Sequence, residues 1–135
     1  RSRGLGDVYK RQPLLERRIM SIQKIVDSGW PVRLSFDPIL IYPNWKEDYK
    51  QMFERIKETI SGDKIFDITI GVFRMSDDFF NRFKKTKPDS DLFYSNYDNP
   101  NNVKTVTKDQ KEMVHDFALS QLDGYCNGDK INFWD

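Results

Sequence analysis

The sequence contains few of the side chains that hold metals or form covalent cross-links. Its 135 residues include one cysteine, Cys126, and one histidine, His115. A single cysteine excludes an internal disulfide, which is compatible with a reducing compartment. Cys126 has no histidine or cysteine at ligand spacing, and His115 lies beside Glu112 and Asp116 on the polar side of an expected helix. We therefore predict no metal site, a structural or incidental Cys126 and an exposed His115.

Long apolar runs are also absent. No run approaches the roughly 20 residues that a membrane-spanning helix requires, and the mean hydropathy is −0.72. No apolar segment follows the basic N-terminus, as it would in a secretory signal. We therefore expect one soluble, cytoplasmic domain with no membrane partner.

The sequence has no large excess of charge of either sign. It has 22 basic and 21 acidic side chains, and the first twelve residues carry four of the basic and one of the acidic ones. The remainder therefore has a net charge of −2. This excludes a generally basic surface that coats nucleic acid, so any such binding has to be local.

Residues 1–12 show no apolar periodicity. Residues 4–12, Gly-Leu-Gly-Asp-Val-Tyr-Lys-Arg-Gln, resemble a translated adapter scar of the kind found at the ends of genes predicted from metagenomic assemblies. The alternative is a native disordered arm. Both interpretations predict a leader that does not pack, and the scar also predicts that the native protein continues upstream.

The body of the chain begins with a predicted helix over residues 14–28 and a strand over residues 32–39. The helix has apolar residues at helical spacing, and Gly29 can end it in the left-handed conformation. The strand reads as apolar on both faces for part of its length, as a buried parallel strand does. Its one acid, Asp37, precedes Pro38, which lacks an N–H and ends regular pairing. Because ligands bind at the carboxyl ends of parallel strands, we expect one wall of a site here.

A second helix and strand follow. Asn44 and Glu47 form a capping-box pattern, and an aromatic-rich apolar stripe follows: Trp45, Tyr49, Met52, Phe53, Ile56 and Ile60. A strand from about residue 65 to 73 ends in Arg74. Two strands joined by a helix are expected to be parallel. A two-stranded parallel sheet leaves both edges open, so we predict an α/β fold in the order α–β–α–β–α that is a slice of a larger barrel or sheet.

The last third of the chain is predicted from caps and apolar stripes. Ser76 caps a helix whose phenylalanines, Phe79, Phe80 and Phe83, are expected to face inward. Residues 88–102 read as a loop whose aromatics, Phe93, Tyr94 and Tyr97, either pack on the core or stack on a ligand. Thr107 with Gln110 caps a helix with the buried stripe Met113, Val114, Phe117, Ala118 and Leu122. Residues 130–134 are expected to form a short terminal strand.

Several of these residues match a known family. The sequence has Gly29-Trp30-Pro31, then Phe36-Asp37-Pro38-Ile39, then Tyr42 and Trp45, and a helix ending Met52-Phe53-Glu54-Arg55-Ile56. With Phe73-Arg74-Met75 at the next strand end, this run resembles the C-terminal half of the spore photoproduct lyase family. The resemblance extends from about residue 15 to 83 and is looser from there to residue 135.

The resemblance implies a radical S-adenosylmethionine enzyme with a partial (β/α) barrel. Such enzymes reduce S-adenosylmethionine at a 4Fe–4S cluster held by cysteines in a C-x3-C-x2-C pattern, and this family reverses a thymine crosslink in DNA. The present sequence lacks that pattern and the cysteine that returns a hydrogen atom to the product. The resemblance therefore implies that cofactor and cluster belong to the intact parent and that this fragment alone holds neither. Residues 13–88 would be the C-terminal helix–strand units, residues 89–135 a mostly helical extension with a short strand, and the missing N-terminal half of the barrel the partner.

The resemblance also assigns site residues. Asp37 and Pro38 would lie where a barrel strand approaches the adenosine part of the cofactor, although the family more often has a small residue at the position of Asp37. Arg74 would hold a carboxylate or phosphate; its alternative is an ion pair with a loop acid. The local basic group Arg82, Lys84, Lys85 and Lys87 would face DNA; its alternative is a solvated helix end. No catalytic residue is expected in this segment.

Two other functions compete with this interpretation. One is a self-contained nucleic-acid or protein-binding module that uses the basic helix end and the aromatic loop, without catalysis. The other is a fragment of a hydrolytic barrel with Asp37 as acid or base. The sequence offers no partner carboxylate at a matching strand end, which glycoside chemistry requires.

Overall fold

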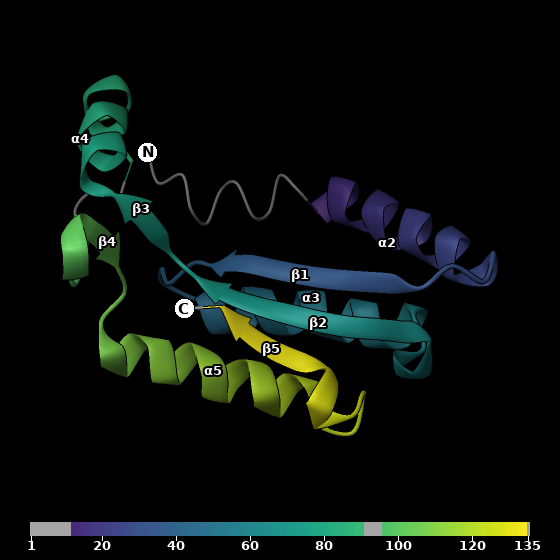
Figure 1. Ribbon diagram of the computed structural model, residues 1–135. Helices are drawn as coiled ribbons and strands as arrows, with labels where there is room; N and C mark the ends of the chain where they lie inside the picture. The colour runs from purple at the N-terminus through teal and green to yellow at the C-terminus, as the bar shows by residue number, and fades with distance from the viewer. Residues whose placement is uncertain (1–11, 91–95, 135) are drawn as a thin grey trace.

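The structure is a computed structural model that describes residues 12–90 and 96–134 (Figure 1). Its main helices are α2 (Gln12–Asp27), α3 (Trp45–Thr59), α4 (Asp77–Thr86) and α5 (Lys108–Leu122). Its strands are β1 (Val32–Ile39), β2 (Ile65–Val72), β3 (Arg74–Ser76), β4 (Val103–Thr105) and β5 (Ile131–Trp134). The predicted leader, apart from its last residue, and the predictions for Phe93 and Tyr94 lie outside the described residues. Within the described ranges, no helix is long and apolar enough to cross a membrane.

The principal sheet has three parallel strands in the order β1-β2-β5. The predicted parallel pair, β1 and β2, is connected through α3, which confirms the predicted α/β order. The C-terminal strand, expected as part of an extension, pairs with the far edge of β2 and so belongs to the same sheet. The edge of β1 that faces away from β2 has no neighbouring strand among the described residues.

One face of this sheet is covered by helices. Phe36, Ile70 and Phe133 share a register row across the three strands. The Phe36 ring lies 4.8 Å from that of Phe53 on α3, and the Phe133 ring lies 4.0 Å from that of His115 on α5. Since side chains in one row point to the same side, α3 and α5 cover this face. His115 is therefore half-buried against Phe133, and its predicted exposure was wrong.

The opposite side of the sheet, here called the open face, carries Arg33, Ser35, Asp67, Thr69 and Asn132. Figure 1 shows no helix in front of it. Arg33 and Ser35 on this side are exposed, whereas the β1 residues on the helix side are buried or half-buried. The prediction that β1 is apolar on both faces was therefore wrong. Its alternation is that of a strand with one buried face.

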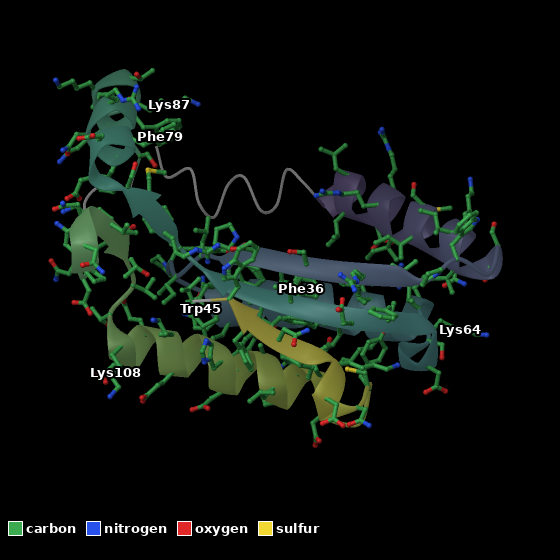
Figure 2. The ribbon with its side chains drawn as sticks, in the orientation of Figure 1. Phe36, Trp45, Lys64, Phe79, Lys87 and Lys108 are labelled. Carbon is green, nitrogen blue, oxygen red and sulfur yellow. The ribbon has the colours of Figure 1, made fainter. Side chains whose placement is uncertain are left out.

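The core between sheet and helices is built from the predicted stripes. Phe53 and Ile60 of the α3 region are fully buried, as are Val114 and Ala118 of α5. Aromatic rings join the two helices: the Trp45 ring lies 5.0 Å from that of Phe117, at an angle of 67° (Figure 2). Edge-to-face packing of this kind stabilises the contact beyond the area that it buries.

The helix caps agree with the sequence at two positions and differ at a third. The Ser76 hydroxyl accepts a hydrogen bond from the Phe79 backbone N–H, and the Thr107 hydroxyl accepts one from that of Gln110. Thr107 and Gln110 form the predicted capping box. Asn44 instead has φ 67° and makes no side-chain cap bond, so the capping box predicted there was wrong. Asparagine tolerates the left-handed conformation, and the turn uses it for that purpose.

A second, two-stranded sheet was not predicted. β3 and β4 pair antiparallel over three residues, and the Thr105 hydroxyl donates a 2.9 Å hydrogen bond to the Phe73 carbonyl. Tyr97 packs its ring 5.0 Å from that of Phe73, which confirms the core position for this loop aromatic. Phe80 is buried, but Phe79 is 47% exposed, so its predicted inward orientation was wrong.

Candidate ligand site at the carboxyl ends of the strands

The carboxyl ends of all three parallel strands meet at Arg74. Its Nη1 donates to the carbonyl of Val72 at 2.8 Å, at the end of β2, and to that of Trp134 at 3.0 Å, at the end of β5. Its Nη2 lies 3.0 and 3.3 Å from the two carboxylate oxygens of Asp37, near the end of β1. Two residues predicted independently for the site are thus bound to each other. The ion-pair alternative for Arg74 is the observed one, with a strand acid in place of a loop acid.

Gly71 makes the position of Asp37 possible. A β-carbon built on Gly71 would overlap the Asp37 carboxylate. The Asp37 and Arg74 side chains are 19% and 28% exposed, so the pair is largely shielded but accessible. Pro38 follows Asp37 through a cis peptide bond, and the β1–β2 register is irregular between Phe36 and Ile39. Regular pairing is therefore interrupted at the predicted residue.

Trp134 completes the cluster and was not predicted as a site residue. It pairs in register with Gly71, so its side chain lies on the open face with the Asp37 carboxylate. It is 62% exposed, and the guanidinium carbon of Arg74 lies 5.3 Å from its ring centroid. The sequence signal that could have found it is an aromatic residue at a strand end.

A large groove of about 1720 Å³ runs from this cluster between α2, β1 and α3, and Asp37 and Pro38 line one part of it. Asp48, also on its wall, is buried and accepts a 3.0 Å hydrogen bond from the Tyr42 hydroxyl. The Tyr49 hydroxyl accepts the Leu40 backbone N–H at 3.1 Å. Sequence analysis missed Asp48, because an acid in a first helical turn is ordinarily an exposed partner of the helix dipole.

The far wall of the groove is held by an ion pair between helices. Arg55 on α3 contacts both carboxylate oxygens of Glu16 on α2, at 2.6 and 2.7 Å. The hydrogen bond from Arg55 lowers the pKa of the Glu16 carboxyl below its ordinary value, and the same bond raises the pKa of Arg55. This pair links α2 to α3 at one side of the groove.

The predicted basic group lies on α4, separate from the strand-end cluster. Figure 1 shows α4 beyond the carboxyl ends of the sheet, joined to it by β3. The rings of Phe79 and Phe83 stack at 5.8 Å, with Arg82 5.9 Å from the first and Lys87 5.7 Å from the second. Figure 2 labels Phe79 on this helix and Lys87 at its C-cap. The cations thus alternate with aromatic surface.

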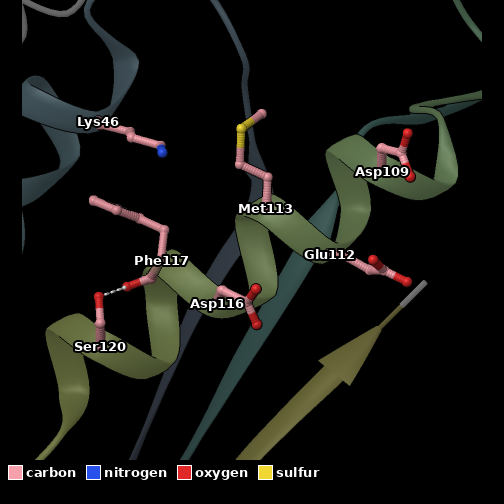
Figure 3. Close-up of a pocket in the computed structure, with 7 residues that line it drawn as sticks. All are labelled: Lys46, Asp109, Glu112, Met113, Asp116, Phe117 and Ser120. Atoms are coloured by element: carbon pink, nitrogen blue, oxygen red, sulfur yellow. Dashed lines mark hydrogen bonds between the residues drawn. The ribbon is translucent and has the colours of Figure 1, made fainter.

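A second pocket, of about 490 Å³, lies between α3 and α5 (Figure 3). Lys46 stands on one side and the acids Asp109, Glu112 and Asp116 on the other. None of the predicted site residues lines it. In the described part of the chain, no group of three or more histidine, cysteine, aspartate or glutamate residues is arranged to hold a metal ion. Burial raises the pKa of the Cys126 thiol, which makes it less reactive.

A parallel sheet whose neighbouring strands β1 and β2 are joined through a helix places the chain in the parallel α/β class. The chain belongs to the spore photoproduct lyase family, whose model matches residues 9–113. It is 24% identical over 137 residues to the spore photoproduct lyase of Clostridium acetobutylicum, and the alignment covers 91% of the chain and 38% of that relative. It is 30% identical over 83 residues to that of Bacillus subtilis, covering 62% of the chain and 22% of the relative.

Solved structures agree with this assignment at the level of fold. A spore photoproduct lyase complexed with dinucleoside spore photoproduct matches with a TM-score of 0.63 and 14% identity, over 86% of this chain and 36% of that one. A double mutant of spore photoproduct lyase with bound AdoMet and dinucleoside spore photoproduct matches with a TM-score of 0.64. The chain therefore spans well under half of the length of the relatives that it matches.

Proposed function

We propose that this chain is the C-terminal part of a radical S-adenosylmethionine enzyme that repairs spore photoproduct in DNA, in the cytoplasm. The observation that supports this proposal most is that Arg74 bonds residues at the ends of three strands, in a chain of the spore photoproduct lyase family. Residues 13–88 then supply the last helix–strand units of a partial barrel, and residues 89–135 add β5 to the same sheet. The unpaired edge of β1 would receive a strand from the N-terminal half of the barrel.

Such an enzyme uses S-adenosylmethionine and an iron–sulfur cluster, and the residues present fit the first of these two groups. Asp37 is accessible at the strand ends and offers a carboxylate acceptor for hydroxyl or amino groups of S-adenosylmethionine, with Pro38 shaping the adjacent backbone. Arg74 already donates to two carbonyls and a carboxylate, so it would act by positioning Asp37. When bound and reduced, the cofactor supplies the radical that abstracts hydrogen.

The iron–sulfur cluster does not fit this segment. Its ligands are three cysteine thiolates, whereas the sequence has Cys126 alone. We propose that the cluster is held by the N-terminal half of the parent.

The experiment uses protein expressed from the complete reading frame, purified without oxygen and reconstituted with iron and sulfide. We expect repair of dinucleoside spore photoproduct and cleavage of S-adenosylmethionine. Asp37→Asn should raise the KM for S-adenosylmethionine about 10- to 100-fold, the loss of one charged hydrogen bond. Asp67→Asn, in the same sheet and paired with the exposed Arg33, is the control and should change it less than twofold. Absence of an iron–sulfur chromophore would refute the function, and an unchanged KM in Asp37→Asn would refute the site.

α4 is proposed to contact the DNA that carries the lesion. Its exposed Phe79 with the flanking Arg82 and Lys87 combines a stacking surface with phosphate-binding cations. Lys84 and Lys85 extend the basic surface along the helix.

We expect Lys85→Glu/Lys87→Glu to weaken binding of duplex DNA. The plot of the logarithm of the binding constant against the logarithm of the salt concentration should become less steep, by the contribution of about two phosphate contacts. The control Lys50→Glu/Lys64→Glu changes the net charge equally at exposed positions elsewhere. Titrations at several salt concentrations give the slope. Equal loss in both double variants would mean that α4 makes no specific contact. DNA binding by the 135-residue chain alone would instead support the binding-module alternative.

A further inference from the structure

We propose that Trp134 is a stacking platform for a nucleobase, with Arg74 fixing the indole from beneath and polar side chains of the open face reading the edge of the base. The proposal rests on the proposed function for the nucleoside class of ligand. It goes beyond it by naming a binding residue, on β5, that lies outside the matched range of the family model.

The indole of Trp134 is accessible to a ligand. Trp134 is 62% exposed at the end of a strand, whereas Trp45, in the core, is 7% exposed. The Trp134 ring lies on the open face, at the carboxyl end of the sheet, where ligands bind in parallel α/β folds. A large exposed aromatic surface at a conformationally defined position is the usual form of a base-stacking site.

The indole of Trp134 also has partners that hold it in place. The Arg74 guanidinium carbon lies 5.3 Å from its ring centroid, and Arg74 also bonds the Trp134 carbonyl at 3.0 Å. Arg74 is itself fixed by the Asp37 carboxylate and by Val72. With this cation beside the ring, Trp134 is still 62% exposed, so a base can reach a platform that needs little ordering when it binds.

The neighbouring row of the open face is polar. Ser35, Thr69 and Asn132 share one register row, two residues before the row of Gly71 and Trp134. Two residues of a strand span about 7 Å, which is the width of a base. The row presents two hydroxyl groups and one amide, which donate and accept hydrogen bonds as the edge of a base requires. An apolar ligand would gain nothing from this row.

The test measures binding of two nucleosides to protein from the complete reading frame. Adenosine represents the base of the cofactor, and the dinucleoside thymidylyl-thymidine represents the bases of DNA. Titration calorimetry gives the dissociation constants, and tryptophan fluorescence reports stacking on the indole. Trp134→Leu should weaken binding of at least one nucleoside about 5- to 100-fold. Trp134→Phe should keep binding within about threefold of wild type, since it retains an aromatic face.

The matched control is Trp30→Leu, which removes another strongly exposed tryptophan from a position outside the sheet. It should leave both constants unchanged. Loss confined to adenosine assigns the platform to the cofactor, and loss confined to the dinucleoside assigns it to DNA. Equal affinities of wild type, Trp134→Leu and Trp134→Phe, or no binding by wild type, would overturn the inference. Because these titrations need no radical chemistry, their failure is distinct from failure of the repair activity.

Discussion

Replacing Arg74 with methionine is expected to destabilise the protein by about 2–4 kcal/mol. The substitution keeps much of the side-chain volume but removes every donor that joins the three strand ends. The Asp37 carboxylate then lies largely shielded without its counter-ion, and the Val72 and Trp134 carbonyls lose the Nη1 donor. Leaving a shielded charge and two carbonyl acceptors without their donor costs more free energy than an exposed ion pair contributes. The partial exposure of the pair keeps this cost below that of a fully buried pair.

The control is Arg33→Met, which breaks the 3.5 Å pair with Asp67 on the same sheet. The Arg33 side chain is 71% exposed, so its loss should change the free energy of unfolding by less than about 0.5 kcal/mol. Urea unfolding of both variants measures the difference. Arg74→Lys should recover only part of the stability that Arg74→Met loses. The lysine restores a positive charge, but one ammonium cannot reach both the carbonyls and the carboxylate. If the Arg74 and Arg33 variants unfold at the same urea concentration, the strand ends are not joined as described.

Gly71→Ala is expected to cost about 1–3 kcal/mol, as overpacking does in a tightly packed site. The added β-carbon would occupy the space of the Asp37 carboxylate, which must then move away from Arg74. Gly128→Ala is the matched control, because nothing lies within 4 Å of a β-carbon built there. It should stay within about 0.5 kcal/mol of wild type.

A third variant, Asp37→Ala, tests whether the cost of Gly71→Ala comes from the Asp37 carboxylate. In Asp37→Ala the obstructing carboxylate is gone, so adding Gly71→Ala should cost less than it does in wild type. We expect an interaction free energy of about 1 kcal/mol or more between the two positions in a double-mutant cycle. Strictly additive effects would show that Gly71 is not reserved for this side chain. The same cycle tests the site without substrate or cofactor.

The sequence predicted the individual elements better than their connections. The main helices and parallel strands follow from apolar periodicity and from caps, as at Ser76 and Thr107. Asp37 and Arg74 were each recognised at a strand end, but their pairing depends on register and on the interruption at Pro38, which composition does not encode. Three-residue strands such as β3 carry no measurable period, so the second sheet was missed.

Trp134 and Asp48 show why part of the site escaped prediction. Periodicity placed Trp134 at the end of a short strand but could not say which strand would be its neighbour. Once β5 pairs with β2, the indole reaches the same place as two residues that are 60 and 97 positions earlier in the chain, Arg74 and Asp37. Asp48 looked like an ordinary acid at a helix start, but it is buried and its carboxylate partner is Tyr42, which belongs to a loop.

If this segment is the C-terminal part of a spore photoproduct lyase-type enzyme, as we propose, the cluster-binding half is encoded upstream. The most direct measurement is a long sequencing read of the native DNA across the codon for Pro13. We expect the reading frame to continue upstream into a C-x3-C-x2-C motif. A start codon and ribosome-binding site immediately before that codon would contradict it, and the binding-module interpretation would then take its place.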